Sequence, residues 1–111
     1  MYRTGVRAMS IAEQFRETAR IIEDKGWCQG ENTRNGKVCV ARAMCLACGI
    51  AIDTPDSAPL LPLRDEETFK VLCRYLKTNY LSPWNDDVNQ TNENVVKVLH
   101  EVADAHGSTG T

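Results

Sequence analysis

The chain has 111 residues, of which 42% are hydrophobic and 25% are charged, and this size and composition indicate one soluble globular domain rather than an intrinsically disordered chain. The formal net charge of −2 at pH 7 gives no basic patch for duplex nucleic acid, so we do not expect a nucleic-acid partner. The absence of a secretory apolar run and of a stretch of membrane-spanning length predicts a cytoplasmic protein without a membrane partner. The sequence does not indicate the oligomeric state, and Met1 and Met9 are both candidate start sites.

The first predicted helix begins after Ser10, because Glu13 stands three residues later and can complete a capping box. Its apolar side has helical spacing and consists of Ile11, Phe15, Thr18 and Ile22. Gly26 is predicted to end the helix in the left-handed conformation, with Trp27 packing back on Ile22 as in a Schellman motif.

A short two-stranded hairpin is predicted within Trp27–Val40, because Asn35 and Gly36 form the dipeptide most typical of a type I′ turn. A ribbon of this length must pack against helices to be stable. Because the flanks are short and polar, a simple polar loop is the alternative.

The segment from Val40 to Cys48 is apolar on nearly every face, and Gly49 follows it, which predicts a helix at the centre of the domain. Arg42 is the only charged residue in this segment. Since an unpaired buried charge is very costly, Arg42 must either reach solvent or bind a carboxylate.

Prolines combined with short polar residues in Ile50–Leu63 predict an irregular surface connection. Asp65 is predicted to cap a third helix, which should fray near Asn79. Glu66 and Glu67 then lie in its first turn, where a helix favours negative charge.

Ser82–Gln90 is predicted to be a turn segment, because it combines proline with carboxylate and amide side chains. Thr91 is predicted to cap the last helix, and Gly107 to end it. Together these patterns predict an all-α or α-rich domain of four helices around the apolar second helix, with a hairpin or turn between the first two. The predicted organisation is a flexible segment over residues 1–9, a single helical domain over residues 10–107 and a disordered tail over residues 108–111.

Four of the five cysteines fall close together in the sequence, and two of these have the two-residue gap common in zinc sites. These four are Cys28, Cys39, Cys45 and Cys48. Because the closely spaced pair lies inside a predicted helix rather than in a zinc knuckle, we favour reduced cysteines that pack in the core, with no metal and no cofactor. A zinc site built from the four cysteines is the alternative.

The sequence contains no catalytic motif specific enough to name a reaction, so we favour a protein that is not an enzyme. A small enzyme that uses Arg42 and Asp86 around an anionic ligand is the alternative. A thiol site drawn from Cys28, His100 and either Asn85 or Asp86 lacks a recognisable catalytic context.

Trp27 and Trp84 each lie in a predicted turn beside polar residues, where an indole either covers the edge of the core or anchors a partner. Core cover is the structural interpretation of both. In the functional interpretation, the two tryptophans and their polar neighbours Gln29, Asn85 and Asp86 bind a protein partner.

Three short motifs carry a resemblance, and they are Gly26-Trp27-Cys28-Gln29-Gly30, Gly36-Lys37-Val38-Cys39 and Trp84-Asn85-Asp86. In these motifs the chain resembles small proteins of actinobacteria and bacteriophages that are grouped as a domain of unknown function. The resemblance covers most of the chain and implies a phage or mobile-element setting, in the cytoplasm of the host cell. It leads to the hypothesis of a small module that binds a host factor or a defence complex.

Overall fold

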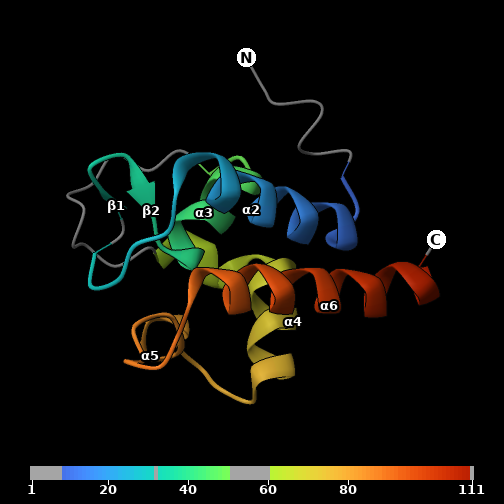
Figure 1. Ribbon diagram of the computed structural model, residues 1–111. Helices are drawn as coiled ribbons and strands as arrows, with labels where there is room; N and C mark the ends of the chain where they lie inside the picture. The colour runs from blue at the N-terminus through green and yellow to red at the C-terminus, as the bar shows by residue number, and fades with distance from the viewer. Residues whose placement is uncertain (1–8, 32, 51–60, 111) are drawn as a thin grey trace.

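The computed structural model describes residues 9–31, 33–50 and 61–110 of the chain (Figure 1). In these ranges the chain forms five α-helices, one 3-10 helix and a two-stranded antiparallel hairpin. In chain order the elements are α2 (Ile11–Lys25), β1 (Thr33–Arg34), β2 (Lys37–Val38), α3 (Val40–Ala47), η1 (Leu61–Asp65), α4 (Glu67–Leu76), α5 (Leu81–Asn85) and α6 (Asn92–Gly110). The predicted helix-rich class, with a hairpin between the first two of these helices, is confirmed.

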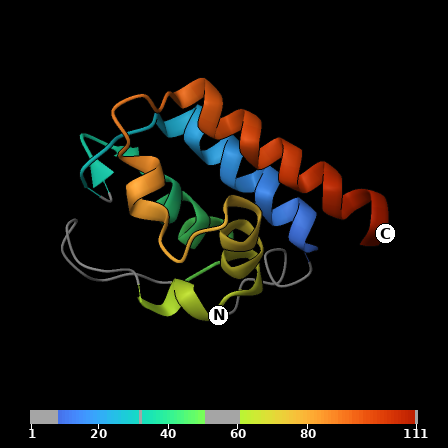
Figure 2. The ribbon, with the colours of Figure 1, turned by 90° about the horizontal axis from the view of Figure 1, so that it is seen from below.

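The helices α2 and α6 lie side by side and run in opposite directions (Figure 2). Arg16 of α2 links the pair at the surface, since one of its nitrogens lies 2.6 Å from Oδ1 of Asp104 and another lies 3.4 Å from Nδ1 of His100. The start of α2 and the end of α6 share one end of the molecule, whereas the hairpin and α5 lie at the opposite end (Figure 1).

The first helix begins as predicted. The Ser10 hydroxyl accepts a hydrogen bond from the Glu13 amide, and the Glu13 carboxylate accepts one from the Ser10 amide. The helix ends at Gly26, whose φ of 92° is positive as expected, but its ψ of 159° is extended and rules out the predicted Schellman ending. A side chain at this position would also meet Lys37, because an added Cβ would lie 2.9 Å from its Cγ.

The predicted hairpin is present, with Asn35 at φ 53° and Gly36 at φ 85° in its turn. Residues 26–28 extend the ribbon, because the Val38 amide donates to the Gly26 carbonyl at 2.9 Å and the Cys28 amide donates to the Val38 carbonyl at 3.0 Å. Because α2 ends at Gly26, the residues that follow it directly pair with β2.

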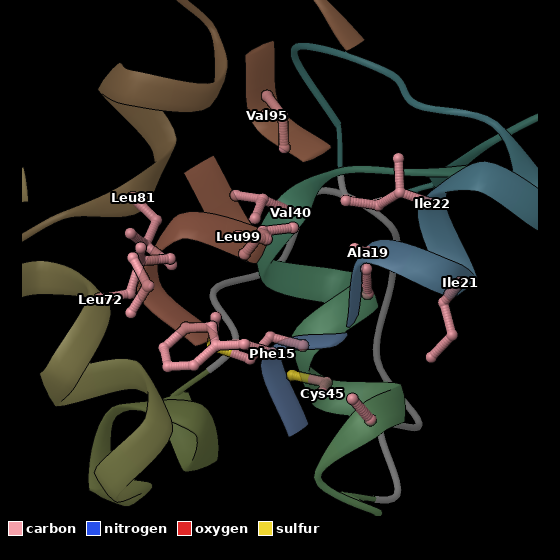
Figure 3. Close-up of a cluster of buried hydrophobic side chains, with 14 of the residues drawn as sticks. Phe15, Ala19, Ile21, Ile22, Val40, Cys45, Leu72, Leu81, Val95 and Leu99 are labelled. Atoms are coloured by element: carbon pink, nitrogen blue, oxygen red, sulfur yellow. The ribbon is translucent and has the colours of Figure 1, made fainter. Parts of the chain in front are cut away.

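The core lies between α2, α3, α4, α5 and α6, and Figure 3 shows side chains from all five converging in one cluster. The apolar segment predicted for the centre is buried as α3, with Val40, Ala43, Met44 and Cys45 inaccessible to solvent. Arg42 of α3 is partly exposed. The helix α2 shares the central position, since it packs against α3, α4, α6 and β2.

Four predictions about the positions of helices are wrong. The N-cap of α4 is Glu66 rather than Asp65, and α4 ends at Leu76 because Lys77 adopts the left-handed conformation with φ 57°. The segment 82–90, predicted as turns, contains the last four residues of α5, in which proline occupies a first-turn position that does not require its amide. The helix α6 continues through Gly107 to Gly110, because glycine permits a helix ending without requiring one.

Several predictions fall on residues outside the described ranges. These are residues 1–8 of the expected flexible segment, residues 51–60 of the expected connection and Thr111 of the expected tail. None of the helices in the described part of the chain has the length and hydrophobicity that a membrane-spanning helix requires.

Candidate functional site

Asn85, the last residue of α5, is only 1% exposed and lies where three distant segments of the chain meet. Its Oδ1 accepts two hydrogen bonds, one from Nε1 of Trp27 at 2.7 Å and one from the amide of Val40 at 3.0 Å. Its Nδ2 donates to the carbonyl of Cys28 at 3.1 Å and to Oδ1 of Asp86 at 2.9 Å. A carboxamide offers two acceptor positions and two donor hydrogens, so the hydrogen-bonding capacity of this buried side chain is fully used.

The hydrogen bond from the Val40 amide to Asn85 helps to cap the start of α3. The first amides of a helix have no partner inside the helix, and this end of α3 is buried. Asn85 accepts from the Val40 amide, and the Cys39 thiol accepts from the Arg42 amide at 3.3 Å. A side chain 45 residues away in the sequence thus completes the cap of α3.

Gln29 joins the hairpin side to the end of α5. Its Nε2 donates to the carbonyl of Asn85 at 3.0 Å and to the carbonyl of Asp87 at 2.9 Å. Asp86 completes the junction, because its Oδ1 accepts from the Gly30 amide at 2.9 Å. We call Trp27, Cys28, Gln29, Val40, Asn85 and Asp86 the Asn85 cluster.

The turn that follows α5 is also held by hydrogen bonds. Asp87 accepts from the Gln90 amide through its carbonyl at 2.9 Å and from the Asn89 amide through Oδ1 at 2.8 Å. The Gln90 side chain donates back to the carbonyl of Trp84 at 3.0 Å. Val88, in the middle of this turn, is 93% exposed, so a fixed backbone presents an apolar side chain to solvent.

The structure brings together the residues that the sequence analysis assigns to partner binding. Trp27 and Trp84 pack against the core while staying partly exposed, and Asp86 is exposed. Asn85 is buried, so it can position a binding surface but cannot contact a partner itself. Sequence reasoning missed Val88, because a single valine in a polar turn carries no motif.

The second predicted candidate, Arg42, has a different environment. Among the described residues Arg42 makes no ion pair, and its backbone amide donates to the thiol of Cys39. The structure therefore offers no carboxylate partner for Arg42 in the described part of the chain.

All five cysteines lie within the described ranges, and none of them forms a disulfide. Burial raises the pKa of Cys45 to about 12 and those of Cys28 and Cys48 to about 11. A raised thiol pKa disfavours the thiolate, which is the form that attacks electrophiles and binds metals. No group of three or more His, Cys, Asp or Glu side chains is arranged to hold a metal ion in the described part of the chain.

The chain matches the model of a known protein family. The model with the description "Family of unknown function (DUF6197)" matches residues 6–105, which include the whole Asn85 cluster. No curated protein and no solved structure matches the chain. The predicted resemblance to a domain of unknown function is confirmed at that level.

Proposed function

We propose that this chain, which belongs to the family of unknown function DUF6197, is a non-enzymatic module that binds a protein partner. The proposed contact surface consists of Trp27, Gln29, Trp84, Asp86 and Val88, and we call it the turn surface. Asn85 lies beneath it as the positioning residue.

The observation that carries the proposal is the exposed Val88 on a turn whose backbone is held on both sides. A single exposed apolar residue is ordinary on a protein surface. This one stands on a turn fixed by Gln29, Asp87 and Gln90, so little conformational entropy would be lost when a partner covers it. The partly exposed rings of Trp27 and Trp84 add the residue type most enriched among interface hot spots.

We further propose the biological setting that the sequence resemblance implies. In that setting the protein is encoded by a phage or mobile element, resides in the host cytoplasm and binds a host factor or defence complex. Its support is the resemblance of the Gly26–Gly30 and Trp84–Asp86 motifs to actinobacterial and phage proteins.

A site-specific crosslinking experiment tests the turn surface. A photoreactive phenylalanine analogue is placed at Val88 in one protein and at Glu23, an exposed residue of α2, in the matched control. After irradiation in host cells, we expect one protein to crosslink to the Val88 position and not to the Glu23 position.

The captured protein is then used in a binding assay with Val88→Asp. A charge in the centre of an apolar contact should weaken binding at least about tenfold, while the melting temperature stays unchanged because Val88 makes no core contact. Full affinity of Val88→Asp, or equal crosslinking from both positions, would contradict the proposed surface.

A further inference from the structure

A surface pocket opens between η1, one face of α4 and the segment that connects α4 to α5, elements that Figure 2 shows next to one another. Its volume of about 610 Å³ lies within the range of about 300–1,000 Å³ typical of small-molecule sites. The lining includes four cationic and two aromatic side chains, namely Arg64, Lys70, Arg74, Lys77, Phe69 and Tyr80. We call this site the α4 pocket.

The cations of the α4 pocket come from two elements. Lys70, Arg74 and Lys77 follow one another at spacings of four and three residues, which places them along one face of α4 and its C-cap. Arg64 reaches the pocket from η1. Four positive charges therefore surround one pocket of a chain whose net charge is −2.

These charges are only partly neutralised. Arg74 pairs with Glu67 at 3.1 Å, whereas Lys70 and Lys77 form no ion pair with any described residue. Three arginines of other regions differ in this respect, since Arg16, Arg20 and Arg34 pair with Asp104, Glu17 and Glu31, respectively. Three cations without an ion pair among the described residues, Arg64, Lys70 and Lys77, therefore line one pocket, whereas the other such cations, Lys25, Lys37 and Arg42, do not line it.

An aromatic ring lies at the same place. The guanidinium of Arg64 stands 5.3 Å from the centroid of the Tyr80 ring, which is a cation–π contact, and Tyr80 is 57% exposed. The favourable end of a helix dipole explains cations at Arg74 and Lys77. The helix dipole does not explain why Arg64 and the exposed Tyr80, which lie outside α4, line the same pocket.

We propose that the α4 pocket binds a small phosphorylated molecule with a planar ring, of the chemical class of nucleotides. Several cations in one pocket match the multiple charges and acceptor oxygens of a phosphate chain. The exposed ring of Tyr80 provides a face on which a base can stack.

A small ligand fits the observations better than a nucleic-acid polymer. A polymer needs a basic track that extends along its backbone. Here the cations are confined to residues 64–77, and the three arginines paired elsewhere do not extend the track. The proposal goes beyond protein binding at the turn surface, and the residues of the two sites do not overlap.

Calorimetric titration of the purified chain tests the proposal with ADP, pyrophosphate and adenosine as probes. The pocket variant is Lys70→Gln with Lys77→Asn, because asparagine tolerates the left-handed backbone at position 77. The matched control is Lys25→Gln with Lys97→Gln, which removes the same charge from exposed positions outside the pocket.

We expect ADP to bind the natural chain more tightly than either pyrophosphate or adenosine. The pocket variant should lose at least about tenfold in ADP affinity, and the control should change by less than about twofold. Tyr80→Ser should weaken ADP binding more than pyrophosphate binding, because it removes the ring on which a base stacks while all four cations remain.

Three results would overturn the proposal. The first is no binding of ADP at millimolar concentration by a chain that melts cooperatively. The second is an equal loss in the pocket variant and the control, which would show attraction by overall charge alone. The third is much tighter binding of a single-stranded oligonucleotide than of ADP, since that would assign the pocket to a polymer.

Discussion

In the Asn85 cluster the buried side-chain amide of Asn85 has a hydrogen-bond partner for each of its donors and acceptors. In the α4 pocket, by contrast, Lys70 and Lys77 have no ion-pair partner among the described residues. The first region resembles a functional motif in the sequence, and the second resembles an ordinary solvent-facing helix. Polar groups whose hydrogen-bond partners lie within the chain contribute mainly to the stability of the fold. Groups left unsatisfied at a pocket are the ones available to a ligand.

The two regions should also differ in how mutations act. A buried polar group that loses its partner carries the full cost of desolvation, which is about 1–3 kcal/mol for each neutral group. An exposed lysine has water as an alternative partner, so its removal costs little. Substitutions in the Asn85 cluster should therefore reduce stability, and substitutions in the α4 pocket should not.

The largest expected effect comes from Asn85→Ala. This substitution leaves the buried amide of Val40 and the part-buried Nε1 of Trp27 without their acceptor. Two unsatisfied donors predict a loss of at least about 3 kcal/mol in the free energy of unfolding, measured by urea denaturation.

The matched control is Asn89→Ala, since Asn89 is exposed in the turn that follows α5. It should change the free energy of unfolding by less than about 0.5 kcal/mol. A loss below about 1 kcal/mol for Asn85→Ala would show that the cluster is not essential to the fold.

An intermediate effect is expected at alkaline pH from the buried thiols. Burial raises the pKa of Cys45 from 9.0 to about 12, so the folded state retains a proton that the unfolded state loses first. The resulting stability is complete below about pH 9 and is lost as the pH rises toward about 12. Melting temperatures recorded from pH 8 upward should fall through this window.

Cys45→Ala separates the thiol from other groups that titrate in the same range. Its stability at pH 7 should be lower by about 1–2 kcal/mol, because a small cavity replaces the sulfur. Its melting temperature should nevertheless fall less steeply above pH 9 than that of the natural chain. Identical slopes in the two proteins would remove Cys45 from this explanation.

The smallest expected effect on stability is that of Lys70→Gln with Lys77→Asn. Both lysines are exposed and unpaired among the described residues, so the free energy of unfolding should change by less than about 0.5 kcal/mol. Urea denaturation of this variant alongside Asn85→Ala gives the comparison directly. A large destabilisation here would place the lysines in the fold rather than at a ligand site.

Features determined by neighbouring residues could be predicted from the sequence. The capping box of Ser10 and Glu13, the Asn35–Gly36 turn and the apolar run of α3 each depend on a few consecutive positions. Their outcome does not require knowledge of the rest of the chain. This is why the fold class and the order of the first elements were correct.

Features determined by distant contacts could not be predicted. Asn85 lies 58 residues from Trp27 and 45 residues from Val40, and no local pattern predicts which of their atoms form hydrogen bonds. The helix α5 is short and contains a proline, so its composition favours turns. The end of α4 depends on a left-handed Lys77, a conformation that lysine rarely adopts.

The candidate sites show the same division. The sequence motifs located Trp27, Gln29, Trp84, Asn85 and Asp86 as a group, and the structure brings them together. The α4 pocket left no comparable trace, because Lys70, Arg74 and Lys77 fit the polar face of any amphipathic helix. These three cations differ from an ordinary polar helix face because Arg64 and Tyr80 line the same pocket from outside α4.

The antiparallel arrangement of α2 and α6 has a practical consequence for such experiments. The start of α2 and the end of α6 share one end of the molecule, while the hairpin and α5 occupy the other (Figure 1). An affinity tag, a fluorophore or a surface tether joined near either helix end would therefore project away from Trp27, Trp84 and Val88. Attachment to a support near the start of α2 or near the end of α6 would give the protein the same orientation, with the turn surface facing the solution.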